Sequence, residues 1–179
     1  EIYLGLGRVL GEQIGNPERA TKAYESALAL DPENAGALEA LARIRETSGD
    51  ADAALAAIEA LAEKAGSKEA RAEQYLRAAK ILEGRGDHDG AIERYKLALD
   101  ANPRDAGASA ALRAAYLGRG DVNAAVQLLE REIGETDGDR AKAKLAGEMS
   151  ILFRDRLKDE KRAEEAAKRA IAFDPTNLQ

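Results

Sequence analysis

The chain has 179 residues, of which 45% are hydrophobic and 34% are charged, and its formal net charge is -6 at pH 7. The apolar content is too high for a disordered chain, and the lack of cysteine excludes a disulfide framework and a zinc–thiolate site. No uninterrupted apolar stretch is long enough to span a bilayer, so we expect no membrane insertion. The acidic balance argues against nucleic acid as a partner, because phosphate binding needs a basic surface.

The composition favours helices throughout. Alanine, leucine, glutamate, arginine and lysine dominate, and only four prolines are present. No long stretch alternates apolar and polar residues while being rich in valine, isoleucine and threonine, so no strand is predicted. The fold class expected is all-α. The absence of cysteine fits a reducing compartment, and we expect a cytoplasmic location. Because the chain opens at Glu1 rather than at a methionine, we also expect an excerpt of a longer protein.

A short punctuation motif recurs along the chain, a glycine followed by an aspartate or asparagine. Its copies are Gly15-Asn16, Gly49-Asp50, Gly86-Asp87, Gly120-Asp121 and a degenerate Lys158-Asp159. Four residues after each Asp or Asn stands an alanine, at Ala20, Ala54, Ala91, Ala125 and Ala163. The successive steps between these alanines are 34, 37, 34 and 38, and a period of about 34 is typical of helical-hairpin repeats.

Each copy of the motif predicts a tight turn between two antiparallel helices. The glycine ends one helix in the left-handed conformation, and the following Asp or Asn caps the next helix. Pro17 fits the first position of such a second helix, where its missing N–H costs nothing. The small alanine lets the two helix backbones approach closely. We therefore expect repeats at about residues 1–33, 34–66, 67–104, 105–137 and 138–179 in one array.

A longer period overlies the first. Pro32, Pro103 and Pro175 end the second helices of the odd repeats, so this proline recurs once in every two repeats. The even repeats lack it and are followed by the two longer steps between marker alanines. Three or four extra residues make about one helical turn, so the first helices of repeats three and five should each be about a turn longer.

These repeats resemble the tetratricopeptide repeat, with its pattern W-x2-L-G-x2-Y, A-x3-F and P. Repeat one carries Tyr3, Leu6, Gly7, Leu10, Ala20, Tyr24 and Pro32, and repeat three carries Tyr75, Ala78, Ala79, Leu82, Ala91, Tyr95 and Pro103. Repeat four departs from the pattern at Ser109 and Arg113, and repeat two has Arg45 in the tyrosine place. Repeat five follows repeat one in a constant register, for example with Leu157 in the place of Ile14.

The resemblance implies a right-handed α-solenoid of about five helix-turn-helix repeats, whose first helices line a concave groove. It also implies a protein-interaction scaffold that binds a protein or peptide and carries no chemistry of its own. Two alternatives to the fold remain, an unrelated helical bundle and another helical-hairpin solenoid. Alternatives to the function are a structural self-assembly module with end-to-end self-association, and a non-catalytic regulatory appendage of a larger enzyme or of a secretion or signalling protein.

No residue pattern predicts catalysis, a metal site or a cofactor. The only histidine, His88, lies in the first turn of a second helix, between Asp87 and Asp89, where aspartate suits the cap and the helix dipole better than it suits a ligand role. The spacing of Gly5, Gly7 and Gly11 is superficially similar to a dinucleotide-binding loop. No strand precedes it, so close helix packing explains these glycines better.

The resemblance places groove-facing side chains on the first helices. The predicted groove residues are Arg8, Glu39, Arg43, Leu76, Lys80, Ala110, Ala114, Leu117 and Ile151. Arg8, Arg43 and Lys80 form a basic row that could hold a carboxylate-bearing segment, while the alanines, Leu117 and Ile151 could accept an apolar side chain. Alternatively, Glu39, Glu46 and Glu83 neutralise the row and it is ordinary surface.

Overall fold

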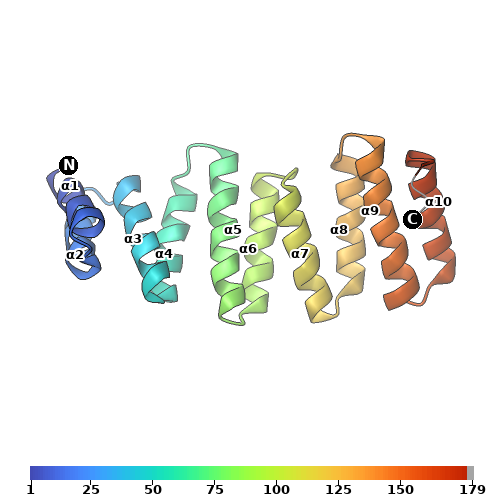
Figure 1. Cartoon of the computed structure of the whole chain (residues 1–179), viewed down its shortest axis with the longest axis horizontal. Helices are drawn as coiled ribbons and strands as arrows, with labels where there is room; N and C mark the ends of the chain where they lie inside the picture. Colours follow the sequence, from blue (N-terminus) through green and yellow to red (C-terminus); the bar gives the residue numbers. More distant parts are fainter. Residues whose placement is uncertain (177–179) are drawn as a thin grey trace. The chain divides into compact units, whose positions relative to one another are not determined.

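The computed structural model describes residues 1–176, and in this part of the chain it contains helices and no strand (Figure 1). The all-α prediction is confirmed. In chain order the elements are α1 (Ile2–Arg8), the π-helix η1 (Val9–Gln13), α2 (Pro17–Leu30), α3 (Ala35–Ser48), α4 (Ala51–Glu63), α5 (Lys68–Gly84), α6 (His88–Ala101), α7 (Ala106–Arg119), α8 (Val122–Glu135), α9 (Asp139–Ile151), the π-helix η2 (Leu152–Arg156) and α10 (Glu160–Phe173). The last three residues of the predicted fifth repeat, 177–179, lie outside the described residues.

The helices pair into hairpins, and the hairpins belong to two compact units, one of residues 1–101 and one that starts at Asn102. In the first unit, α1 packs on α2, α3 on α4 and α5 on α6, and adjacent hairpins meet where α2 packs on α3 and α4 on α5. In the second unit, α7 packs on α8, α9 on α10, and α8 on α9. Each hairpin buries its apolar face against its own partner helix and its neighbour within the unit.

The turns inside the hairpins have the predicted chemistry. Gly15, Gly49, Gly86 and Gly120 adopt φ angles between 69° and 83°, the left-handed region that glycine enters at low cost. The fifth turn has the same conformation at Lys158, with φ of 55°. The residues that follow cap the second helices, with side-chain oxygens of Asn16, Asp50, Asp87, Asp121 and Asp159 accepting from the N–H three residues on. The left-handed turn and the side-chain cap both provide hydrogen-bond partners for backbone groups at the helix ends, which lack partners within the helix.

Small side chains lie where the two helices of a hairpin meet. The marker alanines Ala20, Ala54, Ala91 and Ala125 are fully buried, and Ala163 is buried as well. Gly7 has the same role in the first hairpin, because a Cβ atom there would lie 2.5 Å from Cε1 of the buried Tyr24. The prediction of close packing is therefore confirmed for Gly7, whereas Gly5 faces open space.

The longer first helices predicted for repeats three and five are present. Helix α5 has 17 residues against 14 in α3 and in α7. The 13 residues of α9 continue directly into the five residues of η2. The prolines 32, 103 and 175 each stand two residues beyond the end of a second helix, as predicted.

A π-helical turn ends the first helix of the first hairpin, and another ends the first helix of the fifth hairpin. Segments η1 and η2 begin at Val9 and Leu152, which are equivalent positions in the two repeats. In each, an N–H donates to the carbonyl five residues earlier, from Ile14 to Val9 and from Leu157 to Leu152, both at 3.1 Å. A π-turn accommodates one extra residue in a helix. Repeat three supports such an insertion in repeat one, because four residues separate Leu10 from Gly15 but only three separate Leu82 from Gly86.

Candidate functional site

The basic row of the first unit lies on three successive first helices, with Arg8 on α1, Arg43 on α3 and Lys80 on α5. All three side chains are exposed. Among the residues that the structure describes, none of the three forms an ion pair or a side-chain hydrogen bond. Three positive charges at equivalent positions therefore lack an internal counter-ion.

The carboxylates that could have neutralised this row are bound by other residues. Arg77 on α5 reaches back to α3, where its guanidinium donates to Glu39 at 2.9 Å and to Glu46 at 2.6 Å. The hydrogen bond to Glu46 is the main reason that the pKa of Arg77 is raised, with the negative charge of Glu39 adding to it. Bidentate contacts of this kind are strong and directional. Sequence reasoning does not single out Arg77, because it assigns the neighbouring Leu76 to the groove and a long side chain can reach several partners.

The third carboxylate, Glu83 at the end of α5, accepts a hydrogen bond from the phenol of Tyr95 on α6, with Oη and Oε2 2.8 Å apart. Tyr95 is 1% exposed, and its burial, then the hydrogen bond and the charge of Glu83, raise the pKa of its hydroxyl. Glu83 is thus engaged at its own hairpin and forms no ion pair with Lys80.

A hollow of about 250 Å³ opens in the first unit between η1, α2 and α3. Its lining combines small and apolar residues with a few polar groups: Gly11, Glu12, Pro17, Tyr24, Ala40, Arg43, Ile44 and Thr47. Tyr24 is 5% exposed, and within the described residues its hydroxyl has no hydrogen-bond partner. Burial, followed by the charge of Glu12, raises the pKa of this hydroxyl, and the charges of Arg8 and Arg43 oppose that rise. Arg43 of the basic row is therefore part of the wall of a concave site.

The predicted groove residues of the second unit are small or apolar. Ala110 and Ala114 on α7 are exposed, Leu117 on the same helix is half-buried, and Ile151 at the end of α9 is 50% exposed. Their spacing of three or four residues places the α7 residues along one helix face.

The two departures from the repeat pattern in the second unit form a polar cluster. Ser109 is buried and donates to Glu132 of α8 at 2.8 Å. Arg113 pairs with the same carboxylate at 2.6 Å and with Glu148 of α9 at 3.2 Å. The cluster therefore joins α7, α8 and α9 through polar contacts.

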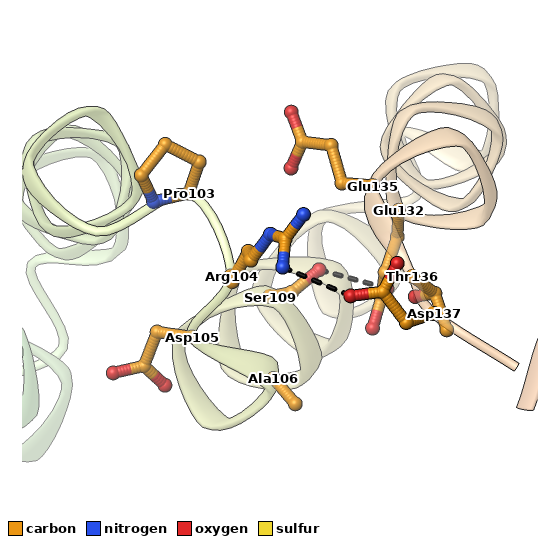
Figure 2. Close-up of a pocket in the computed structure, with 9 residues that line it drawn as sticks. All are labelled: Pro103, Arg104, Asp105, Ala106, Ser109, Glu132, Glu135, Thr136 and Asp137. Atoms are coloured by element: carbon orange, nitrogen blue, oxygen red, sulfur yellow. Dashed lines mark hydrogen bonds and ion pairs between the residues drawn. The ribbon is translucent and has the colours of Figure 1, made fainter.

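A second hollow, of about 240 Å³, lies beside this cluster. Figure 2 shows Ser109 pointing at Glu132 at its wall, while Arg104 pairs with Asp137 across its edge. These four polar side chains form two pairs, Ser109 with Glu132 and Arg104 with Asp137. Each of the four is therefore already engaged within the protein.

Other kinds of site find little support. Within residues 1–176, no group of three or more His, Cys, Asp or Glu side chains is placed to hold a metal ion. No helix in this part of the chain is long and apolar enough to cross a membrane. His88 is exposed in the first turn of α6, behind the cap Asp87, as its sequence context predicted.

The fold defines the chain as a helical-hairpin repeat protein, with glycine turns, capped second helices and alanine contacts repeating along it. Sequence models described as tetratricopeptide repeat match residues 4–70 and 82–146, and between them they cover well over half of the chain. The chain belongs to the tetratricopeptide repeat family.

Relatives and solved structures agree with this assignment. Tetratricopeptide repeat protein 37 of Xenopus laevis is 30% identical over 122 residues, which are 68% of this chain and only 8% of that protein. A crystal structure of MamA has a TM-score of 0.58 at 19% identity, with 92% of each chain covered. A crystal structure of YrrB, described as a TPR protein with an unusual peptide-binding site, has a TM-score of 0.58 at 17% identity and covers 98% of this chain and 87% of its own. Likeness at such low identity shows the fold alone.

Proposed function

We propose that this chain is a non-catalytic scaffold that binds an extended segment of a partner protein along the faces of its first helices. In the first unit the binding residues are Arg8, Glu39, Arg43, Leu76 and Lys80, and in the second unit they are Ala110, Ala114, Leu117 and Ile151. YrrB, whose structure is similar in fold, is described as having a peptide-binding site, and this supports the general class of function.

One observation carries the proposal most strongly, the basic row without internal counter-ions. The three carboxylates considered as neutralising groups are bound elsewhere, Glu39 and Glu46 by Arg77 and Glu83 by Tyr95. Glu12, the other acid near this row, lines the hollow together with Arg43 but forms no ion pair with it among the described residues. Exposed charges that are not paired within the protein remain available to a partner and steer its approach. The row therefore favours a partner segment that carries carboxylates in the first unit. The apolar row of the second unit favours an apolar side chain there.

The proposal is tested by charge reversal on the first helices. Short peptides are selected from a random library on the wild-type chain, and their Kd values are measured by fluorescence anisotropy. We expect the double variant Arg43→Glu, Lys80→Glu to weaken binding at least tenfold, which is about 1.4 kcal/mol.

The matched control is Arg19→Glu, Lys22→Glu, which makes the same change of charge on the exposed face of the second helix α2. Its Kd should stay within twofold of the wild type, apart from the general effect of net charge. If both double variants lose affinity equally, the first-helix row is not the binding surface. If the wild-type chain selects no peptide at all, the scaffold proposal fails.

Self-association is a second candidate, favoured by the exposed apolar face of α1. Ile2, Leu6 and Val9 are 86%, 45% and 39% exposed. Their equivalents in the fifth repeat, Leu145, Met149 and Leu152, belong to the apolar cluster of the second unit. In a second copy, Ile171 of α10 is also exposed and could cover this face. Light scattering tests this candidate: a dimer that Ile2→Lys with Leu6→Lys dissociates would support it, and a monomer at all concentrations would contradict it.

A further inference from the structure

The hollow beside η1 is lined by a tyrosine hydroxyl that the protein itself does not satisfy. Tyr24 is only 5% exposed, and its hydroxyl forms no hydrogen bond with any described residue. The hydroxyl oxygen itself is not sealed from solvent, unlike the buried Oε1 of Gln74, which has no hydrogen-bond partner among the described residues. The O–H of Tyr24 is therefore available to donate to water or to a ligand that enters the hollow.

The third hairpin shows how the same position is satisfied when no π-turn is present. Tyr95 is the equivalent of Tyr24 in that repeat, and its hydroxyl donates to Glu83. Glu12 corresponds to Glu83 when the two repeats are aligned on these tyrosines, so the first hairpin has the same acid available.

The π-turn changes where that acid stands on the first helix. In repeat three Glu83 directly follows the buried Leu82, whereas in repeat one Gly11 separates the buried Leu10 from Glu12. We infer that the extra residue withholds the internal acceptor from the Tyr24 hydroxyl and leaves the hollow open.

The remaining groups around the hollow determine what it can accept. Arg43 lines the hollow and forms no ion pair among the described residues, and Glu12 is the one carboxylate in the lining. Arg8 lies outside the lining, but its positive charge lowers the pKa of the same hydroxyl, as that of Arg43 does. The other walls are small or apolar, like those at Ala40 and Ile44. A phenol O–H and a guanidinium are both donors, which calls for an acceptor that carries negative charge. The methylenes of an aspartate or glutamate side chain fit walls of this kind.

We propose that this hollow binds one acidic side chain of a partner peptide, whose carboxylate accepts from Tyr24 Oη and pairs with Arg43. The proposal rests on the proposed function, since it names the specificity site of the peptide-binding face. The incoming carboxylate takes the place that Glu83 holds at Tyr95. Because of the π-turn in η1, the Tyr24 hydroxyl donates to the ligand carboxylate instead of to an internal acid.

The test uses the peptides selected from the random library, synthesised with acetylated and amidated ends so that side chains supply all carboxylates. Each acidic residue is replaced in turn by its amide, and Kd is measured against four variants. Tyr24→Phe and Arg43→Gln remove one donor each, while Tyr3→Phe and Arg19→Gln are matched controls at exposed residues outside the lining of the hollow. Circular dichroism confirms that each variant folds before binding is measured.

We expect one shared Asp or Glu whose amide replacement weakens binding to the wild type and to both controls about tenfold. The same replacement should weaken binding only about threefold in Tyr24→Phe and in Arg43→Gln, because each variant keeps one of the two contacts and a double-mutant cycle isolates the contact that was removed. If peptides bind but Tyr24→Phe behaves like Tyr3→Phe, the hollow does not hold the acid, and only the scaffold function stands. If no peptide is selected, the scaffold function fails, and this proposal fails with it.

Discussion

Tyr24 and Tyr95 occupy equivalent places in the first and third hairpins, yet only the hydroxyl of Tyr95 forms a hydrogen bond within the described part of the chain. Tyr95 donates to Glu83 within its own hairpin, whereas Tyr24 has no partner among the described residues and faces a hollow. Both rings are buried, and both hairpins carry the same glycine turn and capped second helix. The difference arises from one inserted residue that turns part of the first helix into η1.

The comparison shows how a degenerate repeat can open a hollow without changing its core. The insertion lies at the end of the first helix, where it shifts an acid by one position and leaves the alanine and tyrosine contacts in place. Four predictions test this contrast, from the largest expected effect to the smallest.

The largest effect is expected for Gly7→Ala. The new Cβ atom would lie 2.5 Å from the buried ring of Tyr24, and overpacking of this kind costs about 1–3 kcal/mol. Gly5→Ala is the matched control in the same helix, where nothing lies within 4 Å and alanine should stabilise the helix by up to about 1 kcal/mol. Urea denaturation measures both. Equal effects of the two changes would contradict the close contact between Gly7 and Tyr24.

The two tyrosines should respond differently to loss of the hydroxyl. Tyr95→Phe removes a hydrogen bond to a carboxylate and should lower the free energy of unfolding by about 1 kcal/mol, since Glu83 is exposed and regains water. Tyr24→Phe removes no internal hydrogen bond and should change the free energy of unfolding by less than about 0.5 kcal/mol. Denaturation of both variants under one set of conditions decides the matter, and a larger loss at Tyr24 would show that its hydroxyl has an internal partner.

The fifth hairpin extends the contrast, because it shares the π-turn but has lysine where the first has glycine. Lys158 adopts a φ of 55°, which is unfavourable for a residue with a Cβ atom. Lys158→Gly should therefore raise the free energy of unfolding by about 0.5–1 kcal/mol. The reciprocal Gly15→Lys should lower it by a similar amount. No gain from Lys158→Gly would mean that the lysine side chain stabilises the turn by some other contact.

The smallest effect concerns alkaline pH. Burial raises the pKa of both Tyr24 and Tyr95, and the hydrogen bond to Glu83 adds to the rise at Tyr95. Since the folded chain keeps these phenols neutral, their contribution to stability is present below pH of about 10 and is lost as the pH rises further. Between pH 8 and 11, Tyr95→Phe should flatten the fall in unfolding free energy more than Tyr24→Phe does. The exposed Tyr3→Phe is the control, and identical pH profiles for all three variants would contradict the assignment.

The regular features of the fold were predictable because short local patterns determine them. A glycine followed by an Asx residue predicted the left-handed turn and the cap at Gly49 and Asp50, and the longer step between marker alanines predicted the extra turn of α5. The basic row was predicted at Arg8, Arg43 and Lys80 from the resemblance, and the structure leaves these side chains exposed. Their role in binding stays a prediction.

The features that sequence reasoning missed depend on tertiary contacts. Arg77 could have paired with several acids, and only the packing of α5 on its neighbours brings it to Glu39 and Glu46. Ser109 and Arg113 stand out as departures from the pattern, but their shared partner Glu132 lies on another helix.

The π-turn had a signal in the sequence, the extra residue between Leu10 and Gly15 relative to repeat three. Such a shift alone does not distinguish a π-turn from a longer loop, because both accommodate one more residue. The hollow beside Tyr24 could therefore not be predicted without the structure.

Deletion of Gly11 tests the central claim most directly. It places Glu12 immediately after Leu10, as Glu83 follows Leu82, and restores the residue count of the third hairpin. We expect a cooperatively folded variant in which Glu12 accepts from Tyr24, the hollow closes, and isothermal titration calorimetry gives a Kd at least tenfold weaker for the library-selected acidic peptides. A folded variant that binds those peptides within twofold of the wild-type Kd would contradict the account.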